Sequence, residues 1–177
     1  MRLFVAIELL GTAIKALQDA QEALLRVAAH ARPTQAQHMH LTLAFLGEVA
    51  PTRLASIKAA LDGVNFAPFS LALEKTGIFR RSGGDVVWAG LEKNAALAAL
   101  QADVSRALRG IGVTLEERAF SPHITLAREV RLPPGVGASS VPLAKTGFDV
   151  AAFTLMQSER AAGAPVHTPL HAVSAAT

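Results

Sequence analysis

Apolar residues along the chain follow two different spacings, one typical of strands and one typical of helices. A spacing of three to four residues predicts amphipathic helices over 12–30, from Pro51 to Gly63, and from an Asn94 cap to Gly110. Alternating or continuous apolar runs predict strands at 2–8, 38–46, 69–75, 85–91, 124–127, 148–157 and about 166–173. Residues 129–147 show no period and predict a long loop. Strands and helices intermix without strict alternation, so we expect an α+β fold with mainly antiparallel sheets.

Two of the predicted strands carry the same tetrapeptide pattern. His40-Leu41-Thr42-Leu43 and His123-Ile124-Thr125-Leu126 are 83 positions apart (123 minus 40). Side chains alternate between the two faces of a strand. Each histidine therefore shares a face with the threonine two residues later, while the aliphatic residues face the core. Each copy presents one imidazole and one hydroxyl on the same side.

The repetition extends beyond the tetrapeptides. At the same offset of 83, Leu3-Phe4-Val5-Ala6 aligns with Val86-Val87-Trp88-Ala89, and Phe69-Ser70-Leu71 resembles Phe153-Thr154-Leu155 at an offset of 84. Each half also holds a predicted helix between its first strand and its motif strand. A period this long predicts two pseudo-symmetric lobes with helices outside and a groove between them. We therefore expect residues 1–177 to form one domain, in which each lobe gives one motif strand to a shared site.

The composition is that of a mildly basic globular protein without thiol chemistry. Hydrophobic residues make up 51% of the chain, and no apolar run approaches the roughly 20 residues that span a bilayer. Glu8 interrupts the first apolar stretch too early for a secretory signal. The absence of cysteine excludes a disulfide framework, and a net charge of +3 admits nucleic acid as a partner. We expect a cytoplasmic monomer that does not bind membranes.

Two histidines and two threonines brought together suit proton transfer at a phosphate. Free histidine has a pKa near 6.5, so near neutral pH one imidazole can accept a proton while the other donates one. Threonine hydroxyls can donate hydrogen bonds to non-bridging phosphate oxygens, where charge builds in the transition state. One imidazole would activate water and the other would protonate the leaving oxygen, without a metal ion. We therefore assign His40, Thr42, His123 and Thr125 to the site.

A metal site is the alternative interpretation of the same region. His38 and His40 would share a strand face, and paired imidazoles bind zinc. Acidic residues are sparse near the motifs, so we favour the metal-free interpretation and expect no cofactor. His30 and His171 are expected at the surface, and a place at the cleft edge is one option for His167.

Arginines occur close to the motifs. Arg80 and Arg81 lie in a glycine-bearing loop, and Arg128 and Arg131 follow the second motif. The guanidinium fork pairs with phosphate oxygens, and a solvated loop charge is the alternative role for these side chains. Strict alternation from His123 would point Arg128 away from the site. Arg128 can therefore contribute only if the strand ends or bulges before it.

These motifs resemble those of the 2H phosphoesterase superfamily, which paired His-x-Thr-x tetrapeptides define. Within it, the chain is similar to the bacterial and archaeal RNA 2′,3′-cyclic phosphodiesterases, also called 2′-5′ RNA ligases. The resemblance covers nearly the whole chain. It is carried by residues 2–7, 40–49, 86–90, 120–128 and 168–170.

The resemblance implies hydrolysis of a terminal RNA 2′,3′-cyclic phosphate to a 2′-phosphomonoester, in a groove between two α+β lobes. It implies that His40 donates a proton to the departing 3′ oxygen and that His123 takes a proton from water. Thr42 and Thr125 would hold the phosphate, and Arg128 stands where the family often has a basic residue near the substrate. The implied partner is RNA with cyclic phosphate ends, tRNA fragments among them. The reverse reaction would join such an end to a 5′-hydroxyl through a 2′-5′ bond.

The chain departs from the family pattern at two positions. The family often has a polar amide at the place of His38 and tyrosine at the place of His167. Two other functions stay open: a module that binds RNA ends or nucleotides with little turnover, and a phosphodiesterase of the same superfamily that acts on another 2′-linked nucleotide. Few aromatic side chains are available to stack bases, and the candidates are also candidates for the core: Phe45, Phe79, Trp88 and Phe120.

Overall fold

The computed structural model describes residues 1–177 as nine strands, three α-helices and three short 3-10 helices. Their order is β1 (Arg2–Glu8), α1 (Thr12–Val27), β2 (His30–Pro33), η1 (Ala36–His38), β3 (His40–Glu48), η2 (Pro51–Arg53), α2 (Leu54–Asp62), β4 (Phe69–Phe79), β5 (Asp85–Leu91), α3 (Ala95–Gly110), β6 (His123–Arg131), η3 (Ala138–Ser140), β7 (Gly147–Val150), β8 (Ala152–Ala161) and β9 (Ala164–Ser174). No helix is both long enough and apolar enough to cross a membrane.

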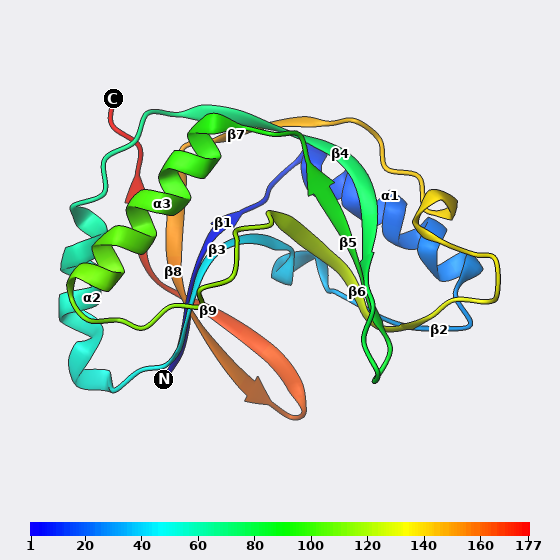
Figure 1. Ribbon diagram of the computed structural model, residues 1–177, viewed down its shortest axis with the longest axis horizontal. Coiled ribbons are helices and arrows are strands. Elements are labelled where there is room, and N and C mark those ends of the chain that lie inside the picture. The colour runs from blue at the N-terminus through cyan, green and yellow to red at the C-terminus, as the bar shows by residue number, and fades with distance from the viewer.

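The strands form two antiparallel sheets, one in each lobe (Figure 1). The sheet of the first lobe has the order β3-β1-β8-β9, and the sheet of the second lobe has the order β2-β6-β5-β4-β7. The motif strand β3 is the edge of its sheet and contacts the other motif strand, β6, across the junction between the lobes. The predicted α+β class with mainly antiparallel sheets is confirmed.

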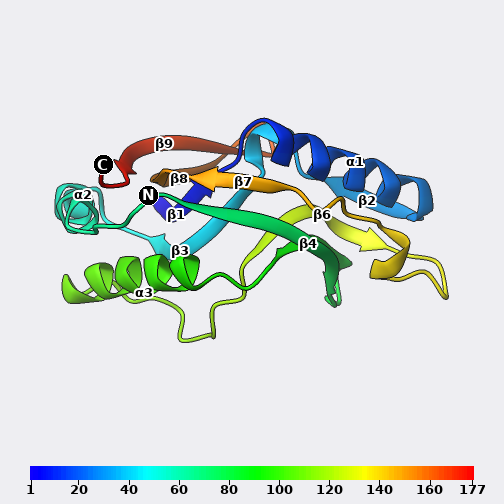
Figure 2. The same cartoon turned by 90° about the horizontal axis from the view of Figure 1, so that it is seen from above.

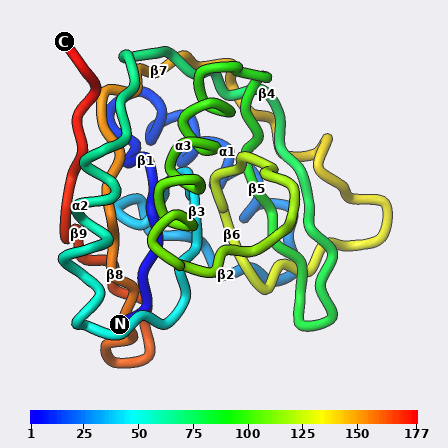
Figure 3. Tube along the Cα trace, turned by 60° about the vertical axis from the view of Figure 1, so that its left-hand side comes forward, coloured from blue at the N-terminus to red at the C-terminus, as the bar shows by residue number.

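The two halves of the sequence exchange elements between the lobes. Helix α1, from the first half, packs on β2, β6 and β7 of the second lobe, whereas α3, from the second half, packs on β3 of the first. Figure 2 shows α1 and α3 at opposite ends of the molecule, and Figure 3 shows α3 in front of β3, on which it packs. Strand β8 likewise lies beside β1, and β4 lies beside β5. Each lobe therefore contains elements from both halves.

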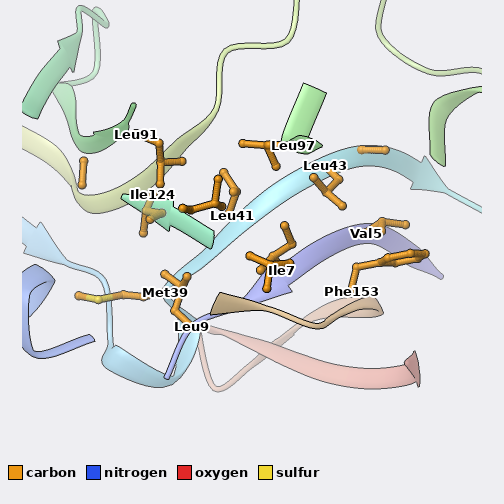
Figure 4. Packing of buried hydrophobic residues seen from close by; sticks show 14 of the residues in the cluster. Val5, Ile7, Leu9, Met39, Leu41, Leu43, Leu91, Leu97, Ile124 and Phe153 are labelled. Carbon is orange, nitrogen blue, oxygen red and sulfur yellow. The ribbon is translucent and has the colours of Figure 1, made fainter. Parts of the chain in front are cut away.

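A single hydrophobic core joins the sheets to the helices. It contains 36 buried residues from both lobes. The aliphatic residues between the motif histidines and threonines, Leu41 and Ile124, are fully buried in it. Figure 4 shows Leu41 beside Ile124 and Leu91, which belong to the other lobe. Burying one such side chain stabilises the fold by about 1.5–3 kcal/mol, so the core holds the motif strands firmly in place.

Three predicted boundaries differ from the structure. Helix α1 ends at Val27, and the next residues form the edge strand β2, which pairs with β6. The predicted strand 148–157 is in fact two strands in different sheets, β7 and β8, separated at Ala151. Strand β4 continues to Phe79. In each case the boundary depends on pairing with a strand far away in the sequence, which local spacing does not reveal.

Candidate active site

In the first lobe, the motif histidine and threonine lie on the sheet face opposite the core. His40 pairs with Glu8 of β1, and Thr42 pairs with Ala6. Directly paired residues of antiparallel strands share a face. Leu41, between the two, is fully buried on the other face. The structure thus contains the same-face imidazole and hydroxyl that the alternation predicts.

The second lobe repeats this arrangement. His123 pairs with Gly90 of β5, and Thr125 pairs with Trp88. Ile124 is fully buried on the opposite face. Because β3 and β6 contact each other, the strands that carry the two His-Thr pairs lie side by side at the junction between the lobes.

Each motif strand bulges immediately after its threonine. The register of β3 with β1 skips Leu43, and the register of β6 with β5 skips Leu126. One extra residue reverses the alternation of side chains beyond it. The alanines that follow, Ala44 and Ala127, are therefore buried together with the leucines.

The two bulges bring one further side chain from each strand to the open face. In β3 this side chain is Phe45, which is 56% exposed and pairs with Phe4 of β1. Of the two roles left open for Phe45, base stacking or a place in the core, the exposure excludes the core, because the bulge turns its ring outward beside Thr42. In β6 the side chain is Arg128, which is exposed. Arg128 was expected to reach the site only if the strand ended or bulged before it, and the bulge at Leu126 meets that condition.

A glutamine from each of the two exchanged helices, α1 and α3, donates a hydrogen bond to the backbone carbonyl at one of the bulges. Gln101 of α3 donates to the carbonyl of Leu43 at 3.4 Å, and Gln21 of α1 donates to the carbonyl of Leu126 at 2.7 Å. The carbonyl of Leu126 also accepts from the backbone N–H of Thr34 at 2.9 Å, so Gln21 supplies a second hydrogen bond there. The same device at both bulges ties each motif strand to the helix that covers it.

Both motif histidines are oriented by the same local hydrogen bond. Nδ1 of His40 donates to the carbonyl of His38 at 2.7 Å, and Nδ1 of His123 donates to the carbonyl of Ser121 at 2.8 Å. A carbonyl can only accept, so Nδ1 carries the proton in each ring. Nε2 of each imidazole is thereby left to accept or donate a proton at the site.

Aromatic rings border both imidazoles. The Phe4 ring lies 4.9 Å from that of His40, and the Phe79 ring lies 4.9 Å from that of His123. Trp88 lies 6.0 Å from His123 and covers Gly77 of β4 so closely that an added Cβ there would be 2.2 Å from Cζ2 of the indole. Glycine at this position therefore leaves the space that the indole occupies beside the second motif.

Gly77→Ala should destabilise the second lobe. The methyl group would overlap the Trp88 ring, and relieving such overpacking typically costs about 1–3 kcal/mol. Urea unfolding followed by the fluorescence of this single tryptophan measures both the loss and the movement of the indole. Gly137→Ala is the matched control, because nothing lies within 4 Å of a Cβ at that glycine. An unchanged unfolding midpoint in Gly77→Ala would contradict the expected overlap.

The imidazole of His40 lies in a buried and positively charged environment. Burial, followed by the neighbouring His167, lowers the pKa of His40 to about 4, and Arg128 from the other lobe acts in the same direction. The ring of His167 lies 5.3 Å from that of His40. Burial also lowers the pKa of His167, with further contributions from His38 and Arg128. In the unliganded protein His40 is therefore neutral at pH 7.

His38 lies outside the motif strand. It ends η1, and β3 begins at His40, so the shared strand face expected for these two histidines is not present. The ring of His38 lies 4.7 Å from that of His167, which places His167 at the edge of the site, and Nδ1 of His167 is buried without a partner. No group of three or more histidine, aspartate or glutamate side chains is arranged to hold a metal ion.

Arg128 connects the two lobes electrostatically. It extends from β6 close enough to His40 and His167 of the first lobe to lower the pKa of both. Arg128 is exposed as a residue, but its guanidinium is partly buried, and this burial lowers its pKa, followed by two other guanidinium groups, those of Arg32 and Arg81. The site thus combines two free imidazole nitrogens, two hydroxyls and a guanidinium, a set of groups that suits a phosphodiester.

Comparison with known proteins identifies the family of this chain. The model of the 2′-5′ RNA ligase superfamily matches residues 8–162. The chain belongs to the 2′-5′ RNA ligase superfamily. A relative in this superfamily, the RNA 2′,3′-cyclic phosphodiesterase of Archaeoglobus fulgidus, is 30% identical over 96% of this chain and 98% of its own length.

Two further relatives define the range of similarity. The RNA 2′,3′-cyclic phosphodiesterase of Geobacillus stearothermophilus is 40% identical over 67% of this chain, a match that spans 40% of that protein. The crystal structure of Escherichia coli LigT complexed with 3′-AMP has a TM-score of 0.83 and 30% identity, covering 99% of this chain and 98% of that one. The predicted family and its two-lobed superfamily fold are both confirmed.

Sequence reasoning left the place of Phe45 open between base stacking and the core. It did not single out Gln21 or Gln101, which donate hydrogen bonds to the carbonyls at the bulges. One signal was available for Phe45, because the offset of 83 that aligns the motifs also aligns it with Arg128. The glutamines lie in helical segments far from the motifs in sequence and carried no comparable signal.

Proposed function

We propose that this protein hydrolyses RNA 2′,3′-cyclic phosphate ends to 2′-phosphomonoesters. The observation that carries the proposal is that two contacting strands, β3 and β6, each present a matched His-Thr face whose imidazole has a free Nε2. Relatives named RNA 2′,3′-cyclic phosphodiesterase match this chain over most of its length and support the same activity here. The wider proposal is a monomeric single domain in the cytoplasm that acts on RNA ends, tRNA fragments among them.

In the proposed reaction, water attacks phosphorus while Nε2 of His123 takes its proton. The bond between phosphorus and the 3′ oxygen breaks, and the proton on Nε2 of His40 passes to that oxygen. The ribose keeps a 2′-phosphate and regains a 3′-hydroxyl. Thr42, Thr125 and Arg128 hold the non-bridging oxygens, where the charge of the transition state builds. No step requires a metal ion.

The lowered pKa of His40 fits its role as donor once substrate is present. With a pKa of about 4, His40 is neutral at neutral pH. A phosphate anion beside Arg128 would offset the charge of that guanidinium and raise the proton affinity of His40. The proton donor is therefore formed when the substrate binds. With a 5′-hydroxyl in place of water, the same groups would run the reverse step and form a 2′-5′ bond.

Product analysis tests the reaction. An RNA ending in a 2′,3′-cyclic phosphate should yield only the 2′-phosphate, because the 3′ oxygen is the proposed leaving group. Chromatography against 2′- and 3′-phosphate standards distinguishes the products, and the same rate should persist after exhaustive chelation. A 3′-phosphate product would exchange the leaving group and the roles of the histidines. Binding of a 2′-phosphorylated nucleotide without any turnover would favour the alternative binding module.

Phe45→Ala should lower kcat/KM by about tenfold or more, mainly through KM. The exposed ring next to Thr42 is placed to stack on the terminal base, and base–aromatic stacking is worth about 1–3 kcal/mol. The measurement compares a nucleoside 2′,3′-cyclic phosphate with the base-free ribose analogue. The loss should disappear with the base-free substrate, and Phe45→Trp should restore the activity. An equal loss on both substrates would show that Phe45 acts by packing instead.

A further inference from the structure

Four arginines from three elements of the second lobe lie around the C-terminal end of β6, in the half of the strand that follows the motif. We call them the arginine cluster: Arg32, Arg80, Arg81 and Arg128. Arg32 of β2 pairs directly with Arg128 of β6 in the strand register. Arg80 and Arg81 belong to the turn that joins β4 to β5, the hairpin beside β6 in Figure 1. The cluster therefore continues from the proposed phosphate position at Arg128 onto the surface of the lobe.

The hairpin turn is seated on β6 at a second irregularity of that strand. Glu129 has a φ of 53°, in the left-handed region, and the register with β5 shifts around it. A Cβ added to Gly84 in the turn would lie 2.7 Å from the Cα of Glu129. Only a residue without a side chain fits so close to this backbone. This contact fixes the turn, and with it Arg81, beside Arg128.

The positive charges of the cluster are not equally compensated. Arg80 pairs with Asp85 at 2.6 Å, and Arg32 pairs with Glu129 at 2.9 Å. The backbone N–H of Arg81 also donates to Asp85, at 3.1 Å, but its guanidinium has no carboxylate partner. Partial burial, followed by the charges of Arg32 and Arg81, lowers the pKa of Arg128. Arg81 is thus an exposed cation without a carboxylate partner, carried by a turn that is seated against β6.

We propose that Arg81 binds the phosphate group on the 5′ side of the terminal nucleoside, so that the preferred substrate carries a phosphate at that position. This inference rests on the proposed function and adds a second anion contact to it. In an RNA chain that phosphate lies one ribose away from the cyclic end. Arg128 would hold the cyclic phosphate and Arg81 the next one along the chain. Hydrogen bonds between guanidinium and phosphate are charge-assisted and stronger than neutral ones.

The test compares four substrates that differ only on the 5′ side. They are adenosine 2′,3′-cyclic phosphate, its 5′-phosphorylated form, the dinucleotide ending in the same cyclic phosphate, and that dinucleotide with an uncharged methylphosphonate linkage. The wild-type kcat/KM should rise about 10- to 100-fold on addition of the charged 5′ group, as expected for a hydrogen bond to a charged partner. The methylphosphonate dinucleotide should lose that gain. The 5′-phosphorylated nucleoside and the natural dinucleotide distinguish a free phosphate from an RNA linkage as the source.

Three variants identify the residue responsible. In Arg81→Gln, the ratio of kcat/KM between the charged dinucleotide and the bare nucleoside should fall to near one. Arg81→Lys should keep most of the ratio because the charge remains. Arg109→Gln is the matched control, because this exposed arginine lies in the last turn of α3, which packs on the other lobe. The gain in wild type should also shrink as salt concentration rises.

The outcomes separate the inference from the function on which it rests. Equal kcat/KM for all four substrates in the wild type, or an unchanged ratio in Arg81→Gln, would overturn the role of Arg81 and leave the cyclic phosphodiesterase intact. A similar fall of the ratio in Arg109→Gln would also overturn it, since the effect would then follow total charge. Failure of the wild type to hydrolyse any of the four would instead refute the proposed function.

Discussion

His40→Asn and His123→Asn should each lower kcat/KM for a nucleoside 2′,3′-cyclic phosphate by about 10²- to 10⁴-fold, the usual contribution of one general acid or base. Asparagine is the informative replacement, because its side-chain amide can take the place of Nδ1 and donate to the carbonyl of His38 or Ser121. The strand is then kept in place while Nε2 is lost. Steady-state kinetics measure the effect. Circular dichroism and thermal unfolding check that each variant keeps its fold.

A substrate with sulfur in place of the 3′ oxygen separates the two histidines. A thiolate leaves without a proton far more readily than an alkoxide, since a thiol has a pKa near 8.5. His40→Asn should recover much of its activity on this substrate, whereas His123→Asn should not. The opposite pattern would exchange donor and acceptor. His30→Asn, an exposed histidine at the start of β2, should match the wild type on both substrates.

The second large effect is on stability at low pH. His40 has a pKa of about 4 in the folded protein against the usual 6.5, so the unfolded chain binds the proton more readily. The stabilising contribution of the neutral ring is complete above pH 6.5 and is lost as the pH falls towards 4. A shift of this size corresponds to about 3 kcal/mol in the free energy of unfolding. His167, whose pKa is lowered as well, acts in the same direction.

Urea unfolding of wild type and His40→Asn at pH 7, 5.5 and 4 measures this loss. Other groups titrate over the same range, so the informative quantity is the difference between the two proteins at each pH. The variant should gain about 3 kcal/mol relative to wild type between pH 7 and pH 4. A difference that is the same at all three pH values would show that His40 keeps its ordinary pKa in the folded state.

The sequence was most informative where a residue's role depends on its immediate neighbours. Alternation within the motif strands correctly predicted that His40 and Thr42, and likewise His123 and Thr125, share a face opposite buried aliphatic residues. The cap at Asn94 was also correct, because its side chain accepts from the backbone N–H of Leu97. Such features are set by the chain within one strand or one helical turn.

Features that depend on distant pairing could not be predicted in the same way. The bulges at Leu43 and Leu126 exist only relative to β1 and β5, yet they decide whether Phe45 and Arg128 face the site. The repeat predicted two lobes, but it did not predict that helices and strands cross between them. Matching segments look alike in sequence whichever lobe they join, so the similarity carries no information about the exchange.

The exchange of elements has a consequence for how the site is assembled. One half of this chain holds a single His-Thr face and lacks the helix that covers its own motif strand, because α3 packs on β3 and α1 packs on β6. Both halves must therefore fold together before either face is supported. The equivalent positions after the two bulges hold different residues, Phe45 and Arg128, so the two faces differ chemically although their motifs match.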